Sequence, residues 1–226
     1  MELNADFSKR AAVHGMQIPW LASPMAGVER RMLDRIGNEV ARATTIVRYA
    51  PGSHFSSHVH TGGEEFLVLE GIFQDEHGDY PAGSYIRNPP QTSHTPGSQS
   101  GCTIFVKLWQ FDPEDRTQIR LNTADMEYTA DPLRPAVEVM PLFQDKTEKV
   151  FLEHWQAGAT IELIADNGME ILVLDGSFKE NAEEFSPQSW LRLPKGYRST
   201  AIAGATGAQI WIKRNHLAIA PKAPSA

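Results

Sequence analysis

The sequence predicts an all-β protein built from two copies of one barrel or sandwich module. Fifteen prolines and 17 glycines divide the 226 residues into short runs rich in Val, Ile, Phe, Leu and Trp, with few long helical periods. The hydrophobic and charged fractions, 41% and 22%, are those of a globular protein and exclude a disordered or fibrous one. An internal repeat is the third observation, and it indicates two β domains in tandem.

The repeat relates the two halves of the chain at an offset of 105 residues. Gly63–Phe73 reads GEEFLVLEGIF, and Gly168–Phe178 reads GMEILVLDGSF. Two further pairs of segments match: 85–89 with 190–194, and, at an offset of 106, 101–107 with 207–213. We therefore predict an N-terminal domain over residues 1–123 and a C-terminal domain over residues 124–226.

Alternating apolar residues locate the strands of the first domain. Strands are expected at 43–49, 64–69, 84–88 and 103–111, a helix around 29–37, and a charged linker over 112–123. In the last strand every second residue is apolar, including Cys102, Ile104 and Val106, so this side is expected to face the barrel interior. Lys107 and its counterpart Lys213 are then expected to point outward.

Four polar side chains are predicted to meet inside the first domain. His58 and His60 lie on one face of a strand because side chains alternate with period two. Glu64 has inward parity and needs a compensating partner there, while His94 follows a turn that can return it to the same barrel mouth. Three imidazoles and one carboxylate hold a divalent metal and leave positions open, unlike closed structural zinc. Glu65 stays an alternative to Glu64.

The spacing of these residues resembles the two sequence motifs of the cupin superfamily. The first motif is matched by Gly52, His58, His60, Glu64 and Gly71. The second is matched by Gly83, Pro89 and His94, and departs from the family at Gln91 and Ser98. The resemblance implies two jelly-roll barrels in tandem, a bicupin, with the metal held by His58, His60, Glu64 and His94.

The run Phe73–Gly78 and the ending His94–Pro96 resemble more closely the cupin-like domain of the anti-sigma factor ChrR and its stand-alone relatives. That resemblance implies a zinc-binding barrel that responds to singlet oxygen or peroxide by releasing a sigma factor. The helical zinc module that sequesters the sigma factor needs several cysteines, and this chain has only Cys102. Related cupins of the acetylacetone-cleaving type bind ferrous iron, which keeps an enzymatic function open.

The second domain is expected to lack the metal site. Opposite the four ligand positions stand Leu163, Ala165, Met169 and Ser199. This half is interpreted as a scaffold or, as the alternative, a pocket for an apolar ligand.

These observations lead to two main functional hypotheses. The first is a metal-binding regulator or oxidative-stress sensor of the ChrR type, with zinc expected first and a sigma factor or other regulator as partner. The second is a mononuclear non-haem iron dioxygenase acting on a small molecule; manganese and nickel also suit the ligand set. A purely structural module is a third reading.

Net charge and the length of apolar runs bear on which partners and cellular location the protein is expected to have. The net charge of −7, without clusters of Lys and Arg around aromatic residues, argues against nucleic-acid binding. No apolar run reaches the length of a signal peptide or membrane span, which predicts a cytoplasmic protein, and pairing through sheet edges would allow a homodimer. Cys102 is expected to be a buried hydrophobe, with a redox-sensing thiol as the alternative.

Overall fold

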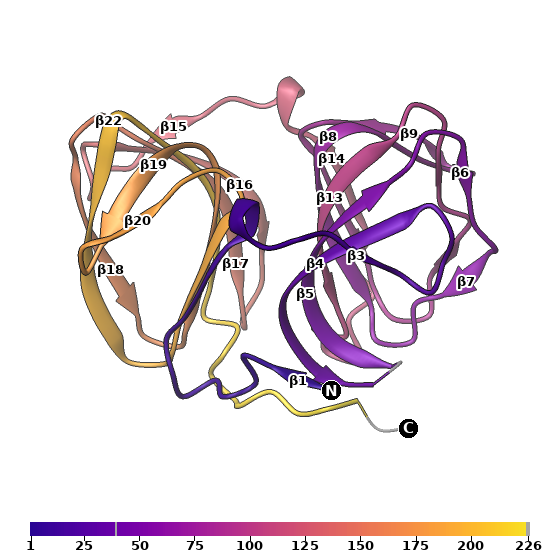
Figure 1. Cartoon of the computed structure of the whole chain (residues 1–226). Coiled ribbons are helices and arrows are strands. Elements are labelled where there is room, and N and C mark those ends of the chain that lie inside the picture. Colours follow the sequence, from indigo (N-terminus) through magenta and orange to yellow (C-terminus); the bar gives the residue numbers. More distant parts are fainter. Residues whose placement is uncertain (39, 225–226) are drawn as a thin grey trace. The chain divides into compact units, whose positions relative to one another are not determined.

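Antiparallel strands form nearly all the regular structure in a computed structural model that describes residues 1–38 and 40–224 (Figure 1). Within that part of the chain there is no α-helix, and the helical elements are two 3₁₀ turns, η1 (Gly15–Gln17) and η2 (Thr123–Asp125). No helix found there is long and apolar enough to cross a membrane. The all-β prediction is confirmed.

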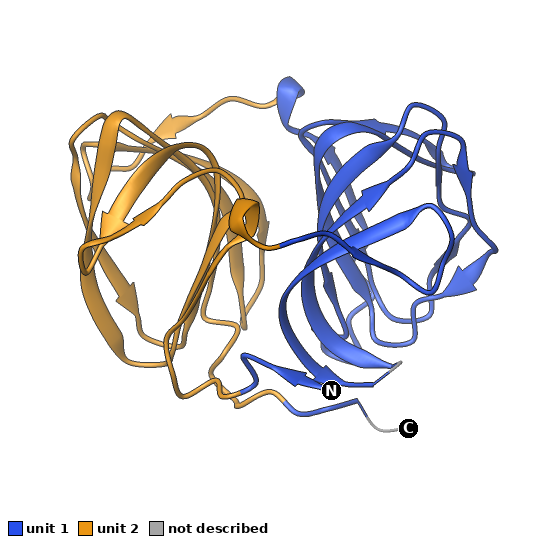
Figure 2. Cartoon of the chain, viewed as in Figure 1, with its two compact units in different colours: residues 1–5, 19–125, 222–226 blue, residues 6–18, 126–221 orange. Residues whose placement is uncertain are grey.

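The strands gather into two compact units (Figure 2). Unit 1 comprises residues 1–5, 19–125 and 222–226, and unit 2 comprises residues 6–18 and 126–221. The boundary near residue 125 lies close to the predicted division at 123 and 124. The predicted N-terminal domain over residues 1–123 did not separate out residues 6–18, which belong to unit 2.

Unit 1 is built around the sheet order β1-β4-β5-β13-β8-β10-β14, with β7 and β11 forming a separate pair. Its strands are β1 (Glu2–Leu3), β3 (Leu21–Ala22), β4 (Val28–Gly37), β5 (Ala41–Tyr49), β6 (Ser53–His54), β7 (His58–Val59), β8 (Glu64–Asp75), β9 (Gly78–Pro81), β10 (Ser84–Asn88), β11 (Ser93–His94), β12 (Gly97–Ser98), β13 (Cys102–Leu108) and β14 (Ile119–Asn122). The interior is apolar and includes Phe66, Val68, Ile104 and Val106.

Unit 2 repeats this arrangement with the order β15-β16-β17-β22-β19-β21-β2. Its strands are β2 (Ala11–His14), β15 (Thr129–Ala130), β16 (Val137–Gln144), β17 (Lys149–Trp155), β18 (Thr160–Ala165), β19 (Met169–Glu180), β20 (Glu183–Phe185), β21 (Ser189–Leu193) and β22 (Tyr197–Arg214). Strands β8, β10 and β13 correspond to β19, β21 and β22, as the repeat predicts.

The last strand position of each main sheet is filled from a different part of the chain. In unit 1 it is β14, which pairs with β10. In unit 2 it is β2, from the N-terminal segment, which pairs with β21. The segment 112–123 is therefore more than a linker, because its second half is a strand of unit 1.

The predicted helix around 29–37 is wrong, because this segment is strand β4. It pairs with β5 along its length, from Val28↔Tyr49 to Gly37↔Ala41, with an irregularity between Met32 and Asp34. Such an irregularity shifts the alternation of side chains, so the sequence loses the strict period of two that identifies a strand.

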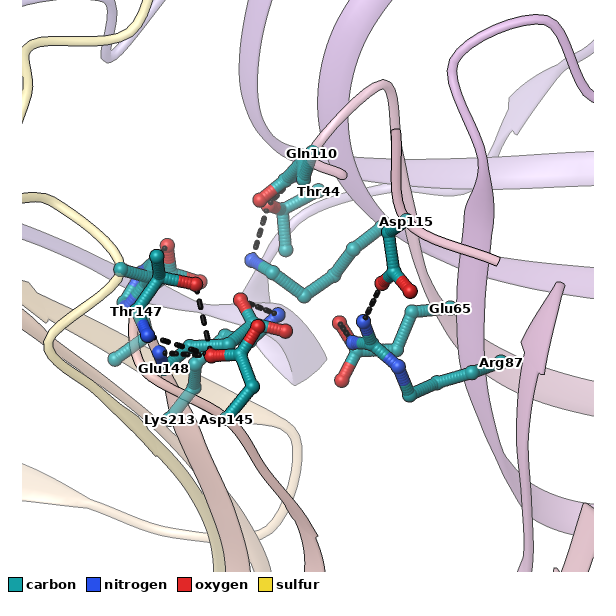
Figure 3. Close-up of polar contacts among 12 residues, drawn as sticks. Thr44, Glu65, Arg87, Gln110, Asp115, Asp145, Thr147, Glu148 and Lys213 are labelled. Atoms are coloured by element: carbon teal, nitrogen blue, oxygen red, sulfur yellow. Dashed lines mark hydrogen bonds and ion pairs between the residues drawn. The ribbon is translucent and has the colours of Figure 1, made fainter. Parts of the chain in front are cut away.

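Lys107 and Lys213 face away from their own barrel interiors, as predicted, but both are buried rather than exposed. The ammonium of Lys107 donates a hydrogen bond to Thr44 Oγ1 at 2.9 Å. In unit 2, Lys213 lies 2.9 Å from a Glu148 carboxylate oxygen (Figure 3). Each buried cation thus has a polar partner that offsets its loss of hydration.

Candidate metal centre

Three short segments of unit 1 bring the histidines together. His58 lies in β7 and His94 in β11, and the two residues are paired across these antiparallel strands. His60 follows two residues after His58, so its ring falls on the same face. Glu64 opens β8 and lies beside them.

The imidazole nitrogens face a common point. His58 Nε2 and His60 Nε2 are 3.2 Å apart, and Glu64 Oε2 lies 3.6 Å from the Nε2 atoms of both His60 and His94. In the described chain, His58, His60 and His94 form a group whose potential ligand atoms lie within 4.8 Å of one another. The sequence-predicted residues are therefore assembled in space.

The other ring nitrogens are turned toward partners that fix the rings. His94 Nδ1 lies 3.3 Å from Asp75 Oδ2, and His58 Nδ1 lies 3.3 Å from the carbonyl oxygen of Ser56. In metal sites a carboxylate or carbonyl that accepts from the second ring nitrogen sets the tautomer, which leaves Nε2 unprotonated for the metal.

Glu64 is held in the same way by a neighbouring strand. The side-chain amide of Asn88 donates to Glu64 Oε2 at 3.3 Å, because β10 pairs with β8 in the register Asn88↔Glu64. Asp75 and Asn88 are thus supporting residues whose role was not recognised from the sequence. The only available signals were the position of Asp75 in the family-like run and that of Asn88 opposite Glu64 in a predicted hairpin.

Burial and charge give the histidines different proton affinities. Burial lowers the pKa of His60, and neighbouring His94 and His58 lower it further against the opposing charge of Glu64. Burial also acts to lower the pKa of His94, but the hydrogen bond to Asp75 and the charges of Glu64 and Asp75 outweigh it, so that pKa is raised. For Asp75, burial opposes ionisation, yet the bonds with His94 and the His77 amide lower its pKa.

The geometry and the donor chemistry fit a divalent metal. Metal–nitrogen and metal–oxygen bonds of about 2.0–2.2 Å place neighbouring ligand atoms about 3–3.5 Å apart. The 3.2 Å separation lies within that range, and the two 3.6 Å separations lie just above it. Imidazole and carboxylate suit zinc, iron, manganese or nickel, so the ligand set leaves the identity of the metal open.

Solvent reaches the cluster from one side. His58 is exposed, whereas His60 and His94 are buried. A cavity of about 240 Å³ is lined by His58, His60, Glu64 and one residue each from β4, β5 and β13. A small molecule could therefore approach a metal held here.

Glu65, the alternative ligand, lies on the opposite face of β8. Tyr85 donates its hydroxyl to Glu65 Oε1 at 2.7 Å, and Arg87 lies 3.9 Å from the other carboxylate oxygen. Arg87 in turn pairs with Asp115 at 2.8 Å (Figure 3). Glu65 thus belongs to a buried polar cluster outside the barrel interior, directed away from the histidines.

Apolar side chains fill the corresponding place in unit 2. Leu163, Ala165 and Met169 are buried members of its hydrophobic core. The hydroxyl of Ser199, at the position equivalent to His94, is buried and has no hydrogen-bond partner among the described residues. At this place the second barrel is filled by packed apolar side chains, whereas the first barrel holds candidate metal ligands.

Comparison with known proteins agrees with this fold. Residues 8–112 match the protein family described as the ChrR cupin-like domain. Among solved structures, a candidate dioxygenase from Nostoc punctiforme matches with a TM-score of 0.73 and 14% identity, covering 100% of this chain and 86% of that one. Protein YlbA from E. coli matches with a TM-score of 0.69 and 11% identity, covering 94% of this chain and 93% of that one. An oxalate decarboxylase variant from Bacillus subtilis matches with a TM-score of 0.63 and 10% identity, covering 91% of this chain and 77% of that one.

These findings define the class of the protein. At such low identities the structural matches establish the fold alone, which is that of the bicupins. The family match places residues 8–112, most of which lie in unit 1, in the cupin superfamily as a ChrR cupin-like sequence. No curated protein matches the chain in sequence.

Proposed function

We propose that unit 1 binds one divalent metal through His58, His60, Glu64 and His94 and presents it to a small molecule. The cavity at the cluster supports this most directly, because candidate metal ligands form part of its wall. A structural zinc site is normally closed by four protein ligands without access for another molecule. An accessible site is typical of catalysis or ligand sensing.

The first function we propose for this accessible site is that of a mononuclear oxygenase acting on a small organic substrate. Bound ferrous iron would supply Lewis acidity and redox chemistry toward O₂. The chain's own residues would orient the ligands: Asp75 holds His94, and Asn88 holds Glu64. The cavity would admit the substrate beside exposed His58.

Metal analysis tests the proposed site first. Protein purified without added metal should contain a single metal ion per chain, and His58→Ala or Glu64→Ala should lose it while remaining folded. His54→Ala is a matched control, because His54 is an exposed histidine nearby in sequence that lies outside the histidine group. Equal metal content in all four proteins would reject the site.

Oxygen consumption then tests the reaction. Iron-loaded protein should consume O₂ with a small β-diketone or a related enolisable acid, and His94→Ala should abolish this. If the iron-loaded protein is inert with both substrate classes, the oxygenase proposal is rejected even if metal is bound.

Oxidant sensing is a second candidate, and the match of residues 8–112 to the ChrR cupin-like domain favours it. Peroxide would then displace the metal or alter the ligands and change the barrel, with zinc as the resident metal and a sigma factor or other regulator as the partner. Treatment with peroxide should release zinc and change the hydrodynamic radius. A protein that keeps both its metal and its shape would exclude this mechanism.

A further inference from the structure

The cavity at the metal centre also contains an arginine contributed by β4. The strand register pairs Arg35 with Ala43, and Ala43 with Leu108. It also pairs Leu108 with Glu64. Paired residues on neighbouring strands project to the same face of a sheet, so Arg35 lies in the same transverse row as Glu64, on the interior face.

The cavity joins these groups in one space. Arg35 and Leu108 line it together with His58, His60 and Glu64. Apart from the histidines, Arg35 is the only basic side chain among the described residues that line it. An entering molecule would therefore meet a guanidinium and the candidate metal ligands at once.

The surroundings of Arg35 favour an anionic neighbour. The side chain is half-buried and donates a hydrogen bond to the carbonyl oxygen of Asn38. Burial and then the nearby charge of Arg30 lower the pKa of Arg35, so both oppose its charged form. A carboxylate at this point would relieve that opposition, and a planar guanidinium suits the two oxygens of a carboxylate.

The indole ring of Trp109 forms part of the cavity wall, and the backbone of this residue has an unusual conformation. Trp109 has a φ of 58°, which is rare for a bulky residue, and its amide donates to the carbonyl of Gly63 at 3.1 Å. A Cβ atom on Gly62 would lie 2.0 Å from the Trp109 ring, so the indole rests directly on the Gly62 backbone. Backbone strain of this kind is concentrated at functional sites.

We propose that this cavity selects a small organic acid, whose carboxylate pairs with Arg35 and whose planar apolar body packs against Trp109. The opposite end of the acid then faces His58 and His60. The volume of about 240 Å³ is below the roughly 300–1,000 Å³ of sites for drug-sized ligands, which favours a small molecule over a peptide. This inference rests on the proposed function, since it names the substrate class of the same site.

Calorimetric titration of the zinc-loaded protein with benzoate and benzamide tests the selectivity, because the two probes have the same shape and differ in charge. Benzoate should bind at least ten-fold more tightly than benzamide. Arg35→Gln should weaken benzoate binding at least ten-fold and leave the affinity for benzamide unchanged. Arg35→Lys should weaken benzoate binding less, because it keeps a positive charge. Trp109→Leu should weaken both probes.

Arg116→Gln is the matched control, because Arg116 is exposed and lies outside the cavity. Circular dichroism and the melting temperature confirm that each variant is folded. Equal affinity for the two probes, benzoate binding that is unchanged by Arg35→Gln, or no binding of either probe would each overturn the proposal.

The same titrations on metal-free protein separate this inference from the proposed function. Zinc uptake without discrimination between the probes would reject the acid specificity and leave the metal site intact. Arg35-dependent benzoate binding by a protein that takes up no metal would reject the metal site and leave an anion site.

Discussion

At the scale of single residues, the candidate metal site depends on the residues that hold the ligands as much as on the ligands themselves. Asp75 orients His94 through Nδ1, a nitrogen that a metal bound at Nε2 would not use, and Asn88 holds the carboxylate of Glu64. Such partners remove rotational freedom before the metal arrives, so less free energy is lost on binding. Their removal should weaken metal binding without deleting a ligand.

Asp75→Asn should lower zinc affinity about 10- to 100-fold, because the neutral amide accepts more weakly from His94 and no longer favours the required tautomer. Competition with a fluorescent zinc chelator measures the affinity. Asp79→Asn, at an exposed position of the same hairpin, should bind zinc like the wild type. An Asp75 variant with unchanged affinity would show that the contact does not orient His94.

Cys102 should behave as a buried apolar side chain. It is buried, and burial raises the pKa of its thiol to about 11 although the contact with Ser98 opposes this. At pH 8 the thiolate, which is the reactive form, is therefore scarce. Native protein should react with a thiol reagent far more slowly than the same protein in denaturant. Rapid native labelling would instead support the redox-sensing alternative.

At the scale of elements, both units use the same glycine at the bend of the long hairpin strand. Gly71 in β8 and Gly176 in β19 have φ values of 72° and 67°. A Cβ atom at Gly71 would lie 2.1 Å from the carbonyl oxygen of Gly101, and one at Gly176 would lie 2.2 Å from that of Gly207. The repeat thus preserves a backbone conformation as well as a hydrophobic pattern.

Gly71→Ala should destabilise the protein by about 1–3 kcal/mol or more, because it combines an unfavourable φ with a close contact to a backbone oxygen. Denaturant unfolding measures this. Gly52→Ala separates the two causes, because Gly52 has a similar φ of 75° but its added Cβ would contact nothing within 4 Å. Equal losses in both variants would assign the whole cost to φ.

Strand β2 is attached to unit 2 by a pH-sensitive contact. Glu183 accepts from Arg10 at 2.5 Å and lies 2.9 Å from His14 Nε2. Burial would raise the pKa of Glu183, but these bonds outweigh it and lower the pKa from 4.5. Because the folded-state pKa is below the unfolded one, the contact stabilises the fold above about pH 4.5, and the gain is lost as pH falls through the folded-state pKa.

Glu183→Gln should therefore reduce the free energy of unfolding at pH 7 by at most about 1 kcal/mol, because the pair is partly exposed. The difference between the variant and the wild type should shrink as pH falls through the folded-state pKa of Glu183. Urea unfolding between pH 3 and pH 7 measures both, and Glu184→Gln, at an exposed position, is the control. A constant difference at every pH would contradict the assignment to ionised Glu183.

At the scale of the whole molecule, the two units share one strand order but differ in what fills their interiors. Polar ligand candidates occupy unit 1, and Leu163, Ala165 and Met169 occupy the equivalent place in unit 2. Metal binding should consequently stabilise only one of the two barrels.

Removing the metal with a chelator should increase amide hydrogen exchange in β8 and leave β19 unchanged. A ligand at 100 times its dissociation constant stabilises the state that binds it by about 2.7 kcal/mol, which is lost on removal. Mass spectrometry of peptides from the two strands provides the measurement. His94→Ala should show no response to chelator, and equal changes in β8 and β19 would contradict a site confined to unit 1.

Much of the architecture and the metal cluster could be predicted, because both leave local patterns in the chain. The repeat identified β8 and β19, and the spacing of His58, His60, Glu64 and His94 identified residues that the structure brings together. Arg35 could not be found in this way, because β4 contains an irregularity that hid its strand character and suggested a helix.

The sequence by itself determined the class of fold, the duplication and the four clustered side chains, because strand alternation and motif spacing act over a few residues. Tertiary structure alone decided that segment 6–18 belongs to unit 2, that Lys107 and Lys213 are buried, and that Arg35 lines the cavity with the histidines. These features depend on pairing between strands far apart in the chain, and no local pattern records which distant strand a residue will meet.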